Sequence, residues 1–200
     1  MKHKTLYDKL HSYSHRFYGE KTPNQVIYWT RRMLAEHKVR VRKYIDTTNT
    51  SYSILCVGGY YDPTIDDDKD IEMFISFNEN ERDVPFKLEE PTVKVFIDEV
   101  FKTLVHEKRH RYQFRQRGNN FGKQYRSNVE DKTLKVQLEY YGDDDEIDAY
   151  AQEAVIEMRL HGKSHSKTKE MYQILFAKTD PVVYNSFLKK FYKYNQKITL

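Results

Sequence analysis

The feature that most constrains this sequence is a long amphipathic helix, which we predict to run from Pro91 to about Arg117. Apolar side chains recur along it at intervals of three and four residues, so one face of the helix must be buried. These side chains are Val93, Phe96, Ile97, Val100 and Leu104. Proline suits the first helical turn, and the Gly-Asn pair at 118–119 is typical of a helix end. The rest of the chain must supply the core for this face.

The same helix carries His106, Glu107 and His110 in the order H-E-x-x-H. Residues four positions apart lie on one face of a helix, so both imidazoles can bind a single Zn²⁺ ion. At about 100° per residue, this face is turned away from the apolar stripe that ends at Leu104. Glu107 can then act as a general base that takes a proton from water. The pattern therefore predicts a metal site at the edge of the core.

The residues before this helix predict both helices and strands. Residues 1–18 and 23–45 are expected to be helical. Apolar residues in β-rich or alternating patterns predict strands at 52–61 and 71–77, which we expect to be antiparallel neighbours. Residues 78–90 are acidic and are interpreted as a linker that leads into the long helix.

The residues after the long helix predict further helices. Residues 119–137 are expected to be basic and irregular, followed by a short strand at Leu134–Tyr141. A second amphipathic helix covers EIDAYAQEAVIEMRL at 146–160, and the acidic residues just before it complement the helix dipole. Two further helices fit residues 166–178 and 182–195.

These elements predict an α+β fold in a single domain, residues 1–200. We expect a small antiparallel or mixed sheet packed on the motif helix and on the second amphipathic helix. Its parts would be N-terminal helices in 1–45, a core with the metal site in 52–160, and C-terminal helices in 166–195.

The composition excludes membrane-spanning and disordered proteins. Hydrophobic residues make up 38% and charged residues 32% of the chain, and no apolar run is long enough to cross a bilayer. The basic N-terminus has no apolar segment after it, so we expect no secretory signal and a cytoplasmic location. Cys56 is the only cysteine, so it forms no internal disulfide, which fits a reducing compartment.

The sequence resembles the zincin metallopeptidases, specifically the gluzincin type, in which H-E-x-x-H is followed by a helix that supplies a glutamate. The matching residues are His106, Glu107 and His110, together with the pattern E-x-x-A at 146–149. The order of parts over about 52–160 is similar to that of small one-domain peptidases of bacteria, phages and mobile elements. The resemblance implies a zinc-dependent endopeptidase with Zn²⁺ as cofactor and a protein or peptide as substrate.

The resemblance also implies a role for each residue of the site. It assigns zinc binding to the two histidines and Glu146, and activation of water to Glu107. The gap of 36 residues between the second histidine and Glu146 is longer than in compact members of the type. Asp148 and Glu153 therefore remain alternative third ligands, because two helical turns bring Glu153 back to the face of Glu146. Glu157 on the same predicted helix is a less favoured alternative.

A zincin usually adds a side chain that donates a hydrogen bond to the developing oxyanion. Five residues after the motif could have this role: Tyr140, Tyr141, Tyr150, His161 and His165. Gln113 lies one turn beyond the second histidine on the same face. It is a candidate to orient a metal ligand by a hydrogen bond without binding the metal itself.

A non-catalytic function is the alternative hypothesis. Residues 1–45 contain eleven Lys and Arg against three Asp and Glu, and residues 101–126 are also basic. Such blocks could bind nucleic acid or an acidic partner in a structural protein of a phage or mobile element, with a metal that only joins helices. No membrane partner is expected.

Overall fold

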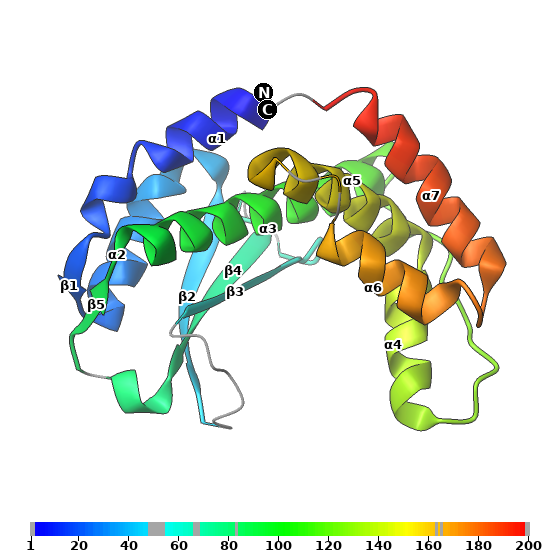
Figure 1. The fold of residues 1–200 in the computed structure, drawn as a ribbon, viewed down its shortest axis with the longest axis horizontal. Helices are drawn as coiled ribbons and strands as arrows, with labels where there is room; N and C mark the ends of the chain where they lie inside the picture. The colour runs from blue at the N-terminus through cyan, green and yellow to red at the C-terminus, as the bar shows by residue number, and fades with distance from the viewer. Residues whose placement is uncertain are drawn as a thin grey trace. The chain divides into compact units, whose positions relative to one another are not determined.

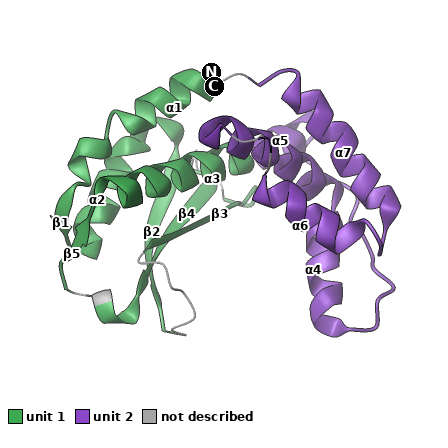
Figure 2. Ribbon diagram, viewed as in Figure 1, with its two compact units in different colours: residues 1–107 green, residues 108–200 purple. Residues whose placement is uncertain are grey.

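The computed structural model describes residues 3–47, 55–65, 69–82, 84–162, 164 and 166–198. These residues form an α+β fold with seven α-helices and two small sheets (Figure 1). The chain divides into two compact units, Met1–Glu107 and Lys108–Leu200 (Figure 2). Among the described helices, none combines the length and the apolar character needed to cross a bilayer.

The first unit contains two helices and five strands, and most of a third helix. The elements are α1 (His3–His11), β1 (Gly19–Lys21), α2 (Pro23–Met33), β2 (Val39–Asp46), β3 (Leu55–Tyr61), β4 (Ile71–Asn78), β5 (Phe86–Leu88) and α3 (Glu90–Gln116). Short 3-10 turns lie at Ser14–Arg16, Ala35–His37 and Glu79–Glu81. The helix α3 continues into the second unit. Its bounds match the long helix predicted from the sequence.

The main sheet has the strand order β2-β4-β3. β2 runs parallel to β4 with Val39 opposite Ile71, and β3 runs antiparallel to β4 with Leu55 opposite Phe77. The antiparallel pairing expected for the two predicted strands is therefore confirmed for residues 55–61, while 52–54 lie outside the described residues. On the central strand β4, four alternate side chains are fully buried: Ile71, Met73, Ile75 and Phe77. This face and the apolar stripe of α3 provide the core of the first unit.

The prediction of helices over 1–18 and 23–45 is wrong in part. The first helix ends at His11, and the second ends at Met33, before the strand β2. Lys38 has a left-handed backbone conformation with φ of 58°, which stops helical geometry. Beyond it, β-branched residues alternate with polar ones, a period of two that is typical of a strand. The parallel partner of this strand lies about thirty residues later, where local sequence cannot reveal it.

The expected linker at 78–90 also contains structure. Its last part forms the strand β5, which pairs antiparallel with β1 and places Gly19 opposite Leu88. Phe86 and Leu88 are buried and Lys87 is exposed, so the alternation is present but only three residues long. This pair of short strands leads directly into α3.

The second unit is helical among its described residues. It contains the end of α3, then α4 (Lys132–Gly142), α5 (Asp144–His161), α6 (Lys167–Phe176) and α7 (Pro181–Asn195). The last two confirm the predicted C-terminal helices. Their core is aromatic, since the Tyr172 ring stacks on Phe187 with centroids 4.1 Å apart, and the Tyr172 hydroxyl donates to the carbonyl of Tyr141.

The strand predicted at Leu134–Tyr141 is wrong, because this segment belongs to α4. Asp131 caps the helix by accepting a hydrogen bond of 2.8 Å from the backbone amide of Leu134. Apolar and polar residues alternate here, but Val136 is exposed while Leu138 is buried. The alternation therefore does not mark a buried strand face, and the capping residue decides the structure.

Residues 119–131 are irregular, as predicted, but the remainder of the predicted irregular segment, 132–137, belongs to α4. Hydrogen bonds attach the irregular residues to the starts of α5 and α7. Backbone amides of Gly122 and Tyr125 donate to the carboxylates of Asp145 and Asp143. The Tyr125 hydroxyl donates to Asp180, the N-cap of α7. The start of α5 is therefore held by the loop that precedes it.

Candidate metal centre

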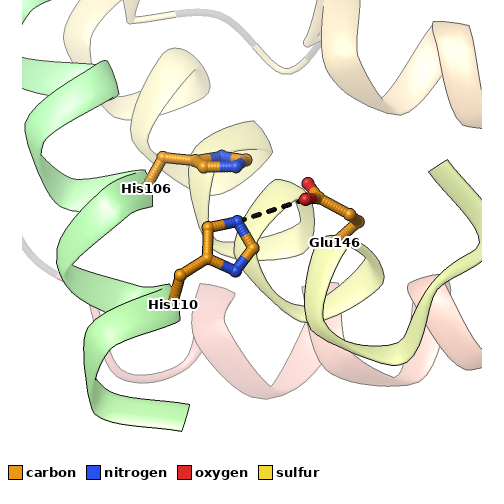
Figure 3. A group of neighbouring side chains, drawn as sticks. All are labelled: His106, His110 and Glu146. Atoms are coloured by element: carbon orange, nitrogen blue, oxygen red, sulfur yellow. Dashed lines mark ion pairs between the residues drawn. The ribbon is translucent and has the colours of Figure 1, made fainter. Parts of the chain in front are cut away.

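Two histidines of the motif lie one turn apart on the continuous helix α3. His106 is buried and His110 is half-buried, whereas Leu104 is completely buried in the apolar stripe. Both imidazole rings project from α3 toward the Glu146 carboxylate (Figure 3). Because α3 is an unbroken helix, its regular geometry fixes the spacing between the two rings.

Glu146 lies in the first turn of α5, where Asp144 and Asp145 are also acidic. Negative charge at a helix N-terminus is favourable, so these residues stabilise the helix end that presents the carboxylate. The Nε2 atom of His110 lies 3.4 Å from the Oε1 atom of Glu146 (Figure 3). The predicted glutamate thus reaches the second histidine despite the long gap in sequence.

His106, His110 and Glu146 form a group that could hold a metal ion, here called the His-His-Glu group. One ligand atom of each lies within 4.8 Å of the others. Zinc bonds of about 2.0–2.1 Å in a tetrahedral site place ligand atoms about 3.3 Å apart, so small side-chain movements would complete the site. Two imidazoles and one carboxylate form a donor set that zinc favours. The residues present therefore fit a zinc ion.

The start of α5 is tied to α3 by side chains that do not belong to the His-His-Glu group. The Gln113 amide donates 3.1 Å hydrogen bonds to the Asp145 carbonyl and to the Asp148 carboxylate. Arg117 forms two hydrogen bonds with the Asp145 carboxylate. Gln113 thus contacts the residue just before Glu146, and it supports the ligand through the backbone.

Asp148, an alternative third ligand, is engaged elsewhere. Its carboxylate accepts hydrogen bonds from Arg109 and Gln113 on α3, and a bond of 3.0 Å from the hydroxyl of Tyr194 on α7. Burial raises the pKa of Tyr194 and the nearby carboxylate adds to the shift, so the hydroxyl stays protonated. The structure brings neither Asp148 nor Glu153 into the His-His-Glu group, and Glu157 instead accepts from Ser166 and the Thr168 amide.

Glu107 is buried in the first unit, beside the strand β3. A Cβ atom placed on Gly59 would lie 3.2 Å from the Glu107 Cγ atom and 2.8 Å from the Thr103 Cγ2 atom. The absence of a side chain at Gly59 therefore lets the strand pass close to the motif helix. In the described sheet, β3 pairs with β4 on one side only. β3 is therefore an edge strand.

Three of the candidate oxyanion donors are tyrosines that lie close together in the second unit. The ring of Tyr141 is 5.0 Å from Tyr140 and 5.3 Å from Tyr150 between centroids. Burial raises the pKa of Tyr150, and charges at Tyr140, Glu146 and Glu153 raise it further. Tyr150 is therefore a neutral phenol one turn beyond Glu146 on α5, whereas Tyr140 is 49% exposed.

His161 lies at the other end of α5 and is exposed. Fifteen residues separate it from Glu146, which corresponds to about 22 Å along a helix. The structure therefore does not bring His161 to the His-His-Glu group. His165 lies outside the described residues.

Three residues with a place in this arrangement were missed in the sequence. Arg109 fills an unspecified position of the motif, Tyr194 lies near the end of the chain, and Gly59 lies in a strand. Their roles depend on contacts with residues 39, 46 and 48 positions away, and no local pattern indicates them.

No protein-family model, curated protein or solved structure matches this chain.

Proposed function

We propose that this protein is a zinc-dependent peptidase that hydrolyses a peptide bond in a protein or peptide substrate. The observation that carries the proposal is the His-His-Glu group, with Glu107 directly after its first histidine. The motif supplies two imidazoles, and α5 supplies the Glu146 carboxylate, which lies 3.4 Å from the second imidazole. This is the donor set of a catalytic zinc site with a position left for water.

In this proposal His106, His110 and Glu146 hold the ion. When bound, zinc lowers the pKa of a coordinated water and polarises a carbonyl group. The chain's own contribution is to hold these three ligands in a largely buried setting and to fix Glu146 through Gln113 and Arg117. Outer-shell contacts of this kind orient a ligand toward the metal.

Glu107 would take the proton of the attacking water and pass it to the leaving amine. Its place in the motif supports this role, because the residue directly after the first histidine is the general base in a site of this kind. The edge of β3 lies beside the same side chain. An extended peptide could add to this edge through backbone hydrogen bonds.

Tyr150 would stabilise the negative charge that develops on the substrate oxygen. A hydroxyl that stays protonated can donate a hydrogen bond as that charge forms, and burial of Tyr150 keeps it in this state. Its position one turn beyond Glu146 favours it over Tyr140, which is half exposed, and over His161 at the far end of α5.

A purely structural metal site is less well supported. Structural zinc sites normally have four protein ligands, whereas the His-His-Glu group contributes three among the residues described. The number of ligands in the group therefore favours catalysis over a metal that only joins two helices.

The test is metal analysis combined with proteolysis of a peptide library by wild-type protein and Glu107→Gln. We expect one zinc per chain in both proteins, with hydrolysis reduced by a factor of about 10² to 10⁴ in the variant. A matched control is Glu90→Gln, which changes an exposed glutamate at the start of the same helix and should retain activity. Zinc-loaded wild type that cleaves no member of the library would contradict the proposal.

A further inference from the structure

One face of the main sheet carries a row of exposed aromatic side chains. Side chains alternate along a strand, so the pairing register identifies which residues share this face. They are Arg40, Arg42 and Tyr44 on β2, Glu72, Phe74 and Ser76 on β4, and Cys56, Gly58 and Tyr60 on β3. The opposite face carries the buried residues of β4 that pack in the core. We call this set the outer sheet face.

The three aromatic rings of the outer sheet face are unusually accessible for residues within strands. Tyr44 is 57% exposed, Tyr60 is 44% exposed and Phe74 is 36% exposed. Phe74 lies on the central strand, and each tyrosine lies on a flanking strand, displaced by two positions from the residue opposite Phe74. Such diagonal neighbours are about 7–8 Å apart, so the rings form an oblique row across the sheet.

Gly58 holds the central ring in place. A Cβ atom added at Gly58 would lie 2.2 Å from the Cζ atom of Phe74, so the ring lies directly over the glycine backbone. The register confirms that these two residues are opposite each other on β3 and β4. The ring is thus supported from below while part of its surface faces solvent.

Positive charge accompanies the rings. Arg40 and Arg42 both pair with Glu72, at 3.9 Å and 2.7 Å, and the Tyr60 hydroxyl donates to the same carboxylate. Arg40 also interacts with the Asp62 carboxylate. The side chain of Arg42 is 58% exposed and lies directly opposite Phe74 in the register. A hollow of about 330 Å³ opens beside them, lined by Arg42, Lys43, Tyr44, Glu72, Phe74 and Ser76. Among the residues that line this hollow, Arg42 and Lys43 outnumber the one carboxylate, Glu72, which leaves an excess positive charge there.

We propose that the outer sheet face binds a single-stranded nucleic acid. Unpaired bases stack on exposed aromatic rings and on guanidinium planes, while arginines neutralise the phosphates. Rings fixed on a sheet suit splayed single-stranded bases, whereas the bases of a duplex are stacked on each other and inaccessible. The combination of aromatic surface with excess positive charge favours a polyanion over an ordinary protein partner. This inference is independent of the His-His-Glu group.

The experiment is fluorescence anisotropy with labelled single-stranded RNA and DNA of about 12 nucleotides, a length within the range that a compact binding surface covers. We expect Tyr44→Ala to weaken binding about fivefold or more, because a stacked base is lost. Tyr44→Phe keeps the ring and should bind like wild type. The matched control is Tyr28→Ala, since Tyr28 is 53% exposed on the basic helix α2 of the same unit.

A charge variant provides a second, independent measurement. Arg42→Gln should weaken binding and reduce the steepness of its salt dependence by about 0.7 in the log-log slope, as expected for one lost phosphate contact with a single strand. This readout stays informative if Tyr44→Ala does not fold, and thermal melts of each variant establish that point.

Three outcomes would overturn the proposal. The first is no binding by wild type in the micromolar range at moderate salt. The second is equal weakening by Tyr28→Ala and Tyr44→Ala, which would assign binding to α2 or to general basicity. The third is a wild-type dimer that becomes monomeric in Tyr44→Ala without any nucleic-acid binding, which would make the face a protein interface.

Discussion

The Nε2 atom of His110 lies 3.4 Å from the Oε1 atom of Glu146, close to the separation of two ligands on a tetrahedral zinc ion. These residues come from α3 and from the first turn of α5, and they are 36 positions apart in sequence. Without a metal, the same atoms can form an ion pair if the imidazole is protonated. Metal binding requires the neutral imidazole, so proton and metal compete at this position.

Glu146→Ala is expected to weaken zinc affinity by more than about 100-fold. Loss of a residue that only hydrogen-bonds to a metal ligand typically weakens affinity about 10- to 100-fold, and loss of a ligand should weaken it more. Competition with a chromophoric chelator measures the change. His161→Ala is the matched control on the same helix and should bind zinc like wild type, because His161 is exposed at the other end of α5. Unchanged affinity in Glu146→Ala would indicate a different third ligand.

Asp148→Asn is expected to weaken zinc affinity about 10- to 100-fold, although Asp148 lies outside the His-His-Glu group. The substitution removes the charge that Arg109, Gln113 and Tyr194 bind, and so loosens the turn of α5 that carries Glu146. Stability should fall by about 1.5–3 kcal/mol, as for a hydrogen bond to a charged group.

The matched control for Asp148 is Asp8→Asn, which removes a carboxylate from an exposed ion pair with Lys4. Such pairs contribute little to stability, so neither unfolding nor zinc affinity should change. Affinities are measured well below the melting temperature of each variant. A loss of stability in Asp148→Asn without any loss of zinc affinity would show that the residue has a structural role only.

Tyr150→Phe is expected to reduce kcat by about 10²- to 10³-fold with little change in KM, the usual effect of removing one oxyanion donor. The comparison variant is Tyr141→Phe, whose ring contacts Tyr150 but which lies on α4. Steady-state kinetics on a substrate identified from the library gives both parameters. Equal losses in the two variants would assign the effect to packing in the tyrosine cluster.

Gly59→Ala is expected to destabilise the first unit by about 1–3 kcal/mol, because the new methyl group overpacks the contact between β3 and α3. The added Cβ atom would lie 2.8 Å from the Thr103 Cγ2 atom and 3.1 Å from the Glu72 carbonyl oxygen. Thr103→Ser removes the nearer obstacle, so the double variant should recover part of the loss. Chemical denaturation of the four proteins measures this coupling.

Acid should weaken the attachment of α1 to α3. Asp98 is buried and accepts from His11 at 3.0 Å and from Lys94 at 3.3 Å. Burial by itself would raise the pKa of Asp98, but these partners lower it below the ordinary value of 3.8. A carboxyl whose folded-state pKa is lowered stabilises the protein above that value and loses this contribution as the pH falls below it.

Asp98→Asn should therefore be less stable than wild type at neutral pH by about 1.5–3 kcal/mol, with the difference shrinking as the pH falls below 3.8. Urea unfolding at several pH values checks this. A constant difference across the acid range would show that the pairing does not depend on the Asp98 charge.

Helix boundaries could be predicted from the sequence where a capping residue, a proline or a glycine marks them. The long helix α3 was predicted within one residue of its observed ends, because its apolar stripe is long and Gly118 and Asn119 adopt positive φ beyond it. The start of α7 was equally clear from Asp180 and Pro181. The predictions were wrong at β2 and α4, where the sequence fits both the helical and the strand period. A short segment of alternating residues can form either structure, and a pairing strand or a capping residue determines which one forms.

The sequence by itself determined the two histidines and Glu107, because one helix fixes their spacing without help from the rest of the chain. For the third ligand it left three candidates open, since Glu146, Asp148 and Glu153 all lie on one helix. Only the tertiary structure shows that Asp148 is bound by Arg109, Gln113 and Tyr194, whereas Glu146 lies beside His110. A ligand from a distant helix depends on packing between elements, and packing is a property of the folded chain that no local pattern encodes.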